Sequence, residues 1–426
     1  MKEIEISFTL RIQPKQTDVH WIEGELLRMR EEVFIGVLKR VLVEIEGEVL
    51  RISRECEVCG SGMVRNGQAL RRMKTLLGVV ELERVRLRCP RCGQEVYPLD
   101  EAIGLEIGES VTLGVRERSL WAAVEVSYEK AHEFLEKFTG LEVSRKKIHA
   151  MALEEGERIG GWEEQRRKRV FEEGGGVEAA GAERAPEVLY VQVDGTAVNG
   201  RGAGEWMECK VGASFSERMK VSKDRFWLRD KKSYASIEGI EAFGEKFFLD
   251  CVRHGVLKAK EVIFIGDGAH WIRTLKEGYF PEAIGVLDIW HLEKELRAAL
   301  GEENQSLIEE LKGLAFEGKG AEIVQRLMGE GARVGEIERR KKILEAMIYV
   351  RNNLDWIGNI PKVNGYGSGP VEKTVDITVA RRFKRRGMHW DRDGANPLLK
   401  LRLLKLNGEW ESYWTQRRTE AARYAA

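Results

Sequence analysis

The sequence lacks a net charge and lacks any long apolar run. Its 426 residues include 70 basic and 70 acidic side chains, so a globally basic surface is excluded and affinity for nucleic acid must come from local clusters. No apolar stretch approaches the roughly 18 to 20 residues that a membrane-spanning helix needs. The first residues include acidic side chains and no continuous apolar segment, which argues against a secretory signal. We therefore expect a cytoplasmic protein that contacts no membrane.

Cysteine is also scarce, with six residues in the chain, but four of the six have the spacing of metal ligands. Cys56 and Cys59, and likewise Cys89 and Cys92, form two Cys-x-x-Cys-Gly segments. Each segment suits a tight turn in which the trailing glycine relaxes the backbone, so that four thiolates can face one structural Zn²⁺ ion. Two redox-active or incidental pairs are the alternative. We predict a zinc ribbon over residues 51–105, with a β-hairpin filling the spacer between the turns.

A helix-turn-helix pattern follows in a predicted helical domain, residues 106–172. Residues 127–138 have the pattern of a first helix, Gly140 breaks it, and Ser144 is a suitable N-cap for a second helix. The second helix begins with three basic residues in the position from which a recognition helix enters the DNA major groove: Arg145, Lys146 and Lys147. An ordinary helical hairpin is the alternative, because such hairpins are common. The arginine-rich spacer of the zinc ribbon would add a phosphate-binding face or, alternatively, a solvated one.

The composition changes at residues 173–187, where Gly, Ala and Glu dominate, and we expect a linker there. Beyond it, strand patterns alternate with helical patterns and a long helical block follows. This order is typical of an α/β core with a helical insertion. We predict this α/β core over residues 188–291 and 363–415, with an all-helical insertion at 292–362. Residues 1–50 include a helical pattern but carry no indication of function.

Three carboxylates are candidates for a catalytic metal site. Asp194 and Asp267 each follow an apolar strand pattern and precede a glycine. If the two strands are neighbours in one sheet, both carboxylates emerge at the same edge, where they could hold two Mg²⁺ or Mn²⁺ ions for phosphoryl transfer. Glu372 lies in the first turn of a helix predicted to begin near Pro370. The alternatives are turn or N-cap aspartates and a glutamate that complements a helix dipole.

The chain resembles the DDE transposases of the Mutator-like superfamily, specifically the ISKra/ISLre-type insertion-sequence enzymes with an amino-terminal zinc ribbon. The segments that carry the resemblance span roughly residues 56–415. They are CEVCG, CPRCG, YPLDEAIGL, VSYEKAHEFLEKFTGLEVSRKKI, VQVDGTAV, FIGDGAHWI, VLDIWHLEKEL, GSGPVEKT and RRFKRRGMHW.

The resemblance implies an RNase H-like core whose catalytic triad is Asp194, Asp267 and Glu372, with an all-helical block inserted before the glutamate. It also identifies Asp288 and His291 with an Asp-x-x-His motif of the family, in which the histidine contacts DNA or orients a carboxylate. The alternative is that Asp288 caps a helix and His291 packs within its first turn.

A basic cluster follows Glu372 and is a second candidate for DNA contact. Trp390 lies just beyond it and could stack on an unpaired base or belong to the core. The cluster consists of Arg381, Arg382, Lys384, Arg385 and Arg386.

The residues together with the resemblance thus predict a nucleoid-associated transposase of an insertion sequence, which binds double-stranded DNA at transposon ends and targets. The resemblance also implies a homo-oligomer. Metal-activated water would cut the strand, and the freed 3′ hydroxyl would attack target DNA. The alternatives are an RNase H-like nuclease without strand transfer and a domesticated zinc-dependent DNA-binding protein without catalysis.

Overall fold

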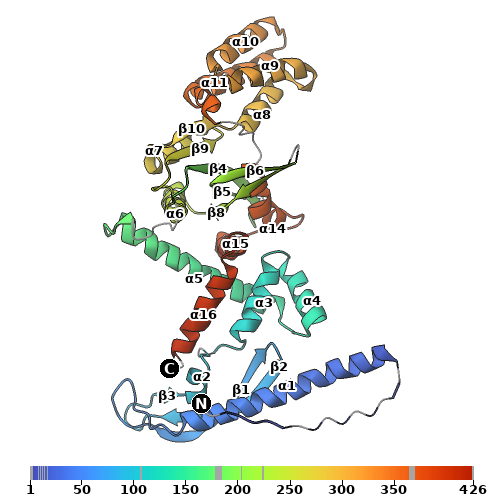
Figure 1. Cartoon of the computed structure of the whole chain (residues 1–426), viewed down its shortest axis with the longest axis vertical. Coiled ribbons are helices and arrows are strands. Elements are labelled where there is room, and N and C mark those ends of the chain that lie inside the picture. The colour runs from blue at the N-terminus through green and yellow to red at the C-terminus, as the bar shows by residue number, and fades with distance from the viewer. Residues whose placement is uncertain are drawn as a thin grey trace. The chain divides into compact units, whose positions relative to one another are not determined.

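The computed structural model describes residues 3–7, 9, 11, 13, 15–16, 18–105, 108–177, 185–202, 204–222, 225–363 and 370–424. They form a mixed α/β fold (Figure 1) with two compact units, Met1–Met151 with Glu409–Ala426 and Ala152–Gly408. The division falls within helix α5 (Arg145–Phe171). Of the predicted linker, residues 178–184 lie outside the described part of the chain. In the described ranges, no helix combines the length and apolar character needed to cross a membrane.

A β-hairpin packed against a long helix forms the core of the first unit. Strands β1 (Val64–Thr75) and β2 (Gly78–Arg88) pair antiparallel, and the short β3 (Glu95–Val96) adds to β2. This hairpin fills the spacer between the cysteine pairs, as the sequence predicts. Its inner side chains meet helices α1 (Val19–Val49) and α2 (Pro98–Ala102) in an apolar core of Leu42, Met73, Val80, Leu82 and Leu99.

The helix-turn-helix pattern has the predicted boundaries. Helix α4 (Tyr128–Thr139) begins where the Ser127 hydroxyl accepts a hydrogen bond from the Lys130 amide at 3.3 Å. It ends at Gly140, whose φ of 70° places it in the left-handed region that favours glycine. The Ser144 hydroxyl accepts from the Lys147 amide at 3.3 Å at the start of α5. Helices α3 (Leu113–Ala123) and α16 (Trp410–Tyr424) complete the helical part of this unit.

A five-stranded mixed sheet lies at the centre of the second unit. Its order is β10 (Ile284–Leu287), β9 (Glu261–Gly266), β4 (Val188–Asn199), β5 (Trp206–Phe215) and β8 (Lys232–Ser236). Strands β10, β9 and β4 run parallel, whereas β5 and β8 pair antiparallel. Strands β6 (Glu217–Ser222) and β7 (Arg225–Arg229) form a separate hairpin. Strands β6, β7 and β8 were not predicted from the sequence.

Strand β4 is longer than the sequence pattern predicts. The apolar run indicates a strand that stops at Asp194, but β4 continues to Asn199. The continuation is stabilised by antiparallel pairing with β5, from Tyr190 opposite Phe215 to Asn199 opposite Trp206. The parallel pairing of β4 with β9 ends earlier, at Gln192 opposite Ile265. Asp194 is therefore paired with β5 on one side of β4, whereas on the other side it lies beyond the last residue that pairs with β9.

Helices pack closely on this sheet at glycine positions. A Cβ on Gly212 of β5 would lie 2.4 Å from the Phe247 ring of helix α6 (Ile240–Arg253). A Cβ on Gly285 of β10 would lie 2.6 Å from the Trp356 indole of helix α12 (Leu354–Gly358). Helix α15 (Arg392–Leu406) packs against β8, the edge strand at the other end of the sheet from β10. These small residues let the helices approach the strands that carry the candidate site.

The predicted helical insertion is a helical bundle that begins and ends at the sheet. It contains α8 (Ile289–Leu300), α9 (Gln305–Phe316), α10 (Gly320–Arg333), α11 (Ile337–Asn352) and α12, drawn in yellow to orange in Figure 1. Helix α8 starts directly after β10, and α12 returns to pack on β10. The insertion therefore starts and finishes beside the strands that carry Asp267 and Asp288.

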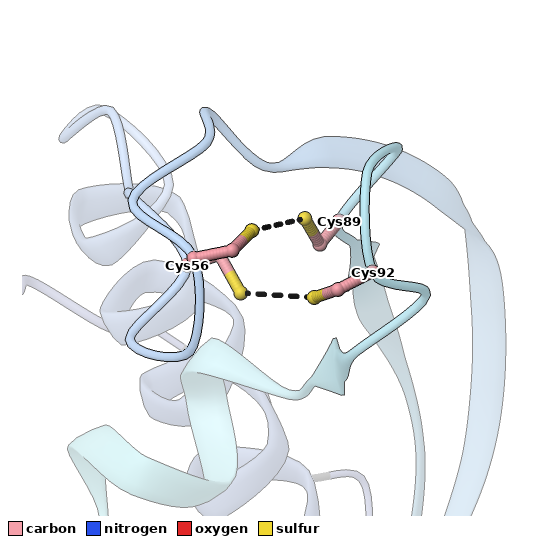
Figure 2. A group of neighbouring side chains, drawn as sticks. Cys56, Cys89 and Cys92 are labelled. Atoms are coloured by element: carbon pink, nitrogen blue, oxygen red, sulfur yellow. Dashed lines mark hydrogen bonds between the residues drawn. The ribbon is translucent and has the colours of Figure 1, made fainter.

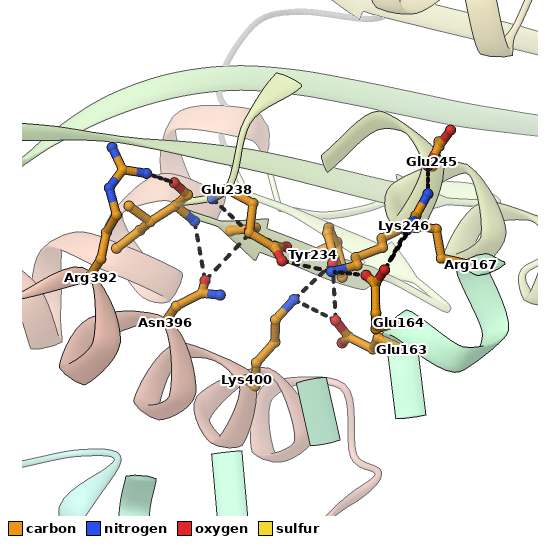
Figure 3. Close-up of polar contacts among 12 residues, drawn as sticks. Glu163, Glu164, Arg167, Tyr234, Glu238, Glu245, Lys246, Arg392, Asn396 and Lys400 are labelled. Carbon is orange, nitrogen blue, oxygen red and sulfur yellow. Dashed lines mark hydrogen bonds and ion pairs between the residues drawn. The ribbon is translucent and has the colours of Figure 1, made fainter. Parts of the chain in front are cut away.

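A buried polar network attaches the second half of α5 to the sheet (Figure 3). The Lys400 ammonium, 2% exposed, lies 2.5 Å from a Glu163 carboxylate oxygen and donates to the Tyr234 hydroxyl at 2.8 Å. That hydroxyl donates in turn to Glu163 at 3.1 Å. Lys246 pairs with Glu164 at 3.0 Å and with Glu238 at 2.6 Å. Because these buried charges have oppositely charged partners, the second half of α5 is held in one orientation on β8, α6 and α15.

Helix α5 crosses α15 at Gly156, and replacement of this glycine tests the contact. A Cβ there would lie 2.3 Å from the Pro397 carbonyl oxygen, and the surrounding backbone cannot move easily. We expect Gly156→Ala to lower the free energy of unfolding by about 1 to 3 kcal/mol, as overpacked cores do. Urea unfolding followed by circular dichroism measures the change.

Gly161 provides the matched control in the same helix, because nothing lies within 4 Å of the position of its Cβ. Gly161→Ala should leave stability unchanged or raise it by up to about 1 kcal/mol, from helix propensity alone. Equal behaviour of the two variants would contradict the close crossing.

Candidate functional site

The four predicted zinc ligands come together in the first unit. The thiols of Cys56, Cys59, Cys89 and Cys92 all lie within 4.8 Å of one another. The sulfur atoms of Cys56 and Cys92 are 3.5 Å apart, and those of Cys59 and Cys89 are 3.4 Å apart (Figure 2). All four cysteines are free thiols. The arrangement has the ligand number and chemistry of a structural four-thiolate metal site.

Both cysteine turns have the same backbone geometry. The Gly60 amide donates to the Cys56 carbonyl at 2.8 Å, and the Gly93 amide donates to the Cys89 carbonyl at 3.0 Å. Gly60 and Gly93 have φ values of 69° and 79°, which L-residues with side chains rarely adopt. The glycine after each cysteine pair is therefore required by the turn that directs the two sulfur atoms inward.

The electrostatics of the cysteine cluster favour a bound cation. Backbone amides of Cys92 and Arg91 donate toward the Cys89 sulfur and lower the pKa of its thiol to about 6. The Ser61 amide favours the Cys59 thiolate, but the neighbouring thiols outweigh it and raise the pKa of Cys59 to about 12. Four thiols this close cannot all ionise unless a cation neutralises them, so the residues fit Zn²⁺.

The two aspartates predicted from the sequence meet at one edge of the central sheet. Because Gln192 of β4 is opposite Ile265 of β9, Asp194 and Asp267 both lie two residues past the last pair of the parallel ladder. One carboxylate oxygen from each and one ring nitrogen of His291 all lie within 4.8 Å of one another. The sequence argument for a shared sheet edge is thereby confirmed.

Asp288 joins the same edge from the third parallel strand. Leu287 of β10 is opposite Gly266 of β9, and the Asp288 amide donates to the Gly266 carbonyl at 2.8 Å. The Asp288 side chain caps α8 by accepting from the Trp290 amide at 3.0 Å, and its second oxygen lies 2.9 Å from Nδ1 of His291. The capping interpretation is confirmed, and the same carboxylate also orients the imidazole toward the aspartates.

Charges within this cluster shift its pKa values. Burial raises the pKa of Asp194, the charges of Asp267 and Asp288 add to that effect, and His291 opposes it. Burial opposes the charged form of His291. The hydrogen bond to Asp288 and the surrounding carboxylate charges outweigh burial and raise the pKa of His291. The site thus favours positive charge at its centre.

Glu372 does not belong to the cluster of Asp194, Asp267 and His291, but charges of the site shift its pKa. It belongs to helix α13 (Pro370–Val375), which packs against β4 and β5. Burial raises the pKa of Glu372, the charges of Asp288 and Asp194 raise it further, and His291 lowers it. Within the described ranges, the group with mutual distances below 4.8 Å contains His291 and not Glu372. The preceding residues 367–369 of the family motif lie outside those ranges.

An open cleft of about 470 Å³ lies over the two aspartates. Its wall includes Thr196, Trp206, Glu208 and Trp271, none of which was assigned a role from the sequence. Trp206 is 65% exposed, although an indole is strongly apolar. The sequence signals for these residues are the positions of Thr196 within the VQVDGTAV segment and of Trp271 within the FIGDGAHWI segment. The cleft walls depend on strand pairing, which the sequence pattern does not reveal.

The glycine after Asp267 has a different role from the expected one. A glycine directly after each aspartate, Gly195 and Gly268, would be expected to leave room for the backbone of a nucleic acid. Gly268 instead has a φ of 78°, and a Cβ there would lie 2.1 Å from the Asn353 side-chain oxygen. The space beside Gly268 is therefore filled by Asn353 at the end of α11, and not by a bound nucleic acid. Gly195 does line the cleft, and its amide donates to Asp194 at 2.7 Å.

The predicted DNA-binding residues divide into exposed and buried ones. Arg382 is 1% exposed and lies 5.0 Å from the Trp390 ring, so it cannot belong to a surface cluster. Trp390 is 9% exposed and donates from its indole to the Phe383 carbonyl at 3.1 Å, which favours its core interpretation. The other basic side chains of both clusters are exposed or half-buried: Arg145, Lys146, Lys147, Arg381, Lys384, Arg385 and Arg386.

Three of the basic residues have informative contacts. Lys147 lies 3.3 Å from a Glu109 carboxylate oxygen, and Arg145 donates to Glu129 at 2.9 Å. Lys384 donates to the Thr196 hydroxyl, which lies on the wall of the cleft. Positive charge from the second cluster therefore reaches the edge of the aspartate site.

The family described as Uncharacterised protein family (UPF0236) matches residues 17–418. UPF0236 protein TTE2489 of Caldanaerobacter subterraneus subsp. tengcongensis is 25% identical over 395 residues, 90% of this chain and 79% of that protein. Another UPF0236 protein of that organism, whose name joins designations from TTE0033 to TTE2212, is 24% identical over 393 residues, 90% and 78% of the two chains. The UPF0236 protein in the vanSb 3′ region of Streptococcus gallolyticus is 22% identical over 410 residues, 92% and 84% of the two chains.

Replacement of one clustered cysteine tests the metal site. We expect the full chain to contain about one zinc ion, and Cys89→Ser to lose it, because three thiolates leave a position open to water and chelators. Elemental analysis after dialysis against a weak chelator measures the content. Cys251→Ala is the control, since Cys251 is a buried thiol outside the cluster. Equal zinc content in wild type and Cys89→Ser would contradict the assignment.

Proposed function

The chain belongs to the family described as Uncharacterised protein family (UPF0236), and we propose that it is the transposase of a prokaryotic insertion sequence. It would bind the terminal repeats of its element and catalyse metal-dependent cleavage and transfer of DNA strands. The observation that carries this proposal is the convergence of Asp194, Asp267 and His291 beneath an open cleft, with Glu372 in the same electrostatic field. A mixed sheet with these aspartates on adjacent strands is compatible with an RNase H-like DDE core.

The names of the relatives provide independent support. One relative's name joins eleven designations within one organism, and another joins four. A coding sequence carried by a mobile element accumulates in several copies, whereas a housekeeping gene usually does not. Multiplicity of this kind favours a transposase over a stand-alone nuclease or a domesticated binding protein.

The site residues suit phosphoryl transfer on a polymer. Divalent ions held by the carboxylates would activate water or a 3′ hydroxyl and stabilise the leaving oxygen. The cleft is open, so a DNA backbone can reach Asp194 without threading through the protein. Lys384 at the Thr196 edge would neutralise a neighbouring phosphate. The helix-turn-helix segment, with Lys146 exposed in the first turn of α5, would contact DNA in the first unit.

Removal of the central carboxylate tests the catalytic assignment. We expect Asp194→Ala to reduce cleavage at least about a thousandfold in Mg²⁺ or Mn²⁺, because metal stabilisation contributes several kcal/mol to such reactions. Binding to terminal-repeat DNA should remain, since the predicted DNA contacts do not include Asp194. The substrate is DNA that contains the sequences flanking the gene, and gel analysis of nicked and joined strands gives the rates.

Asp393→Ala is the matched control, because Asp393 is exposed in the first turn of α15 and does not line the cleft. This variant should cleave like the wild type. Undiminished cleavage by Asp194→Ala would refute the catalytic assignment. Pre-cut element ends that are never joined to target DNA would favour the nuclease alternative, and wild-type chain that binds DNA but never cuts it would favour the binding protein.

A further inference from the structure

The ligand group that contains the two aspartates includes a histidine, and not the glutamate of the expected triad. Among the described residues, Asp194, Asp267 and His291 form the one group at this edge whose ligand atoms lie within 4.8 Å of one another. His291 belongs to the first turn of α8, which begins directly after β10. Its position is therefore fixed by the same parallel strands that place the aspartates.

The orientation of His291 is fixed by Asp288. One Asp288 oxygen lies 2.9 Å from Nδ1 of His291, and the other accepts from the Trp290 amide at 3.0 Å. Asp288 is 4% exposed, and its own amide is bonded to the Gly266 carbonyl. Both carboxylate oxygens of Asp288 thus have donors within the protein, so Asp288 is suited to hold the imidazole and not to bind an ion itself.

This arrangement leaves the other ring nitrogen for a cation. When Nδ1 donates to Asp288, the neutral imidazole carries its lone pair on Nε2. Histidines that bind metals almost always donate their second ring nitrogen to a carboxylate or carbonyl in this way. The three groups supply two hard oxygen atoms and one borderline nitrogen atom, a donor set that Mn²⁺ and other transition ions accept more readily than Mg²⁺ does.

We propose that His291 is a direct ligand of the ion held by Asp194 and Asp267, with Asp288 as its positioning residue. The ion site is then Asp-Asp-His, and Glu372 serves a second ion or a water molecule. The ligand set also makes Mn²⁺ the preferred ion over Mg²⁺. This inference rests on the proposed metal-dependent function but concerns only the ligands.

Pulsed electron paramagnetic resonance of Mn²⁺ bound to the full, zinc-loaded chain tests the proposal without any DNA reaction. We expect modulation from a directly coordinated ¹⁴N nucleus in the wild type and its loss in His291→Ala. Calorimetric titration should show more than tenfold weaker Mn²⁺ binding in His291→Ala, with a smaller effect on Mg²⁺. Asp288→Asn keeps the helix cap and should weaken Mn²⁺ binding about 10- to 100-fold while nitrogen coupling remains.

His270→Ala is the matched control, because His270 is an exposed imidazole three residues from Asp267 and outside the cluster. It should retain both the nitrogen coupling and the affinity for Mn²⁺. Absence of ¹⁴N coupling in the wild type, or its persistence in His291→Ala, would overturn the ligand assignment; the first outcome is decisive even if His291→Ala fails to fold.

Failure of this inference can be separated from failure of the proposed function. A chain that cleaves DNA but shows no nitrogen coupling overturns the histidine ligand alone. A chain with nitrogen coupling that never cleaves DNA supports the ligand assignment and overturns the proposed activity.

Discussion

Mutual repulsion of carboxylates at the sheet edge is the constraint on which the candidate site depends. The parallel ladders of three adjacent strands end close together, so Asp194, Asp267 and Asp288 are forced into one place by backbone pairing. Burial adds to the cost of their charges and raises the pKa of Asp194. The charge of His291 offsets only part of this repulsion. A cation would relieve the repulsion in this cluster, and the cluster as a whole therefore supports the proposed metal site more directly than any single residue does.

The same edge is supported by elements distant in the sequence. From the helical insertion, the Tyr349 hydroxyl donates to the Asp267 carbonyl at 2.7 Å, and Asn353 fills the space beside Gly268. On the Glu372 side, α13 continues into a π-helix at Asp376–Ala380, whose irregular turn frees backbone carbonyls. The buried Arg402 guanidinium donates to the Thr378 carbonyl at 3.0 Å and also to that of Ile377. The helical segment that follows Glu372 is therefore held by a tertiary contact.

The sequence predicts the elements well where local chemistry determines them. Ser127, Gly140 and Ser144 set the helix ends, and the cysteine pairs with their glycines set the two turns. Prediction fails where a partner strand decides the outcome. The extension of β4 past Asp194 depends on β5, and β8 has no strong pattern of its own. Arg382 has the local pattern of a surface residue, yet tertiary packing buries it. The proximity of His291 to the aspartates follows from register, which one sequence cannot supply.

The two candidate metal centres differ in a way that follows from their ligands. Four thiolates complete the coordination of a tetrahedral ion, so the cysteine cluster can stabilise a hairpin that has only a small apolar core but offers no position for a substrate. Two carboxylates and one imidazole leave several positions open on a larger coordination sphere, and the cleft above them admits a phosphate. A site whose coordination positions are all filled by protein ligands confers stability, whereas a site with free coordination positions can bind water or substrate. The open site lies where the parallel pairing of three adjacent strands brings Asp194, Asp267 and Asp288 together.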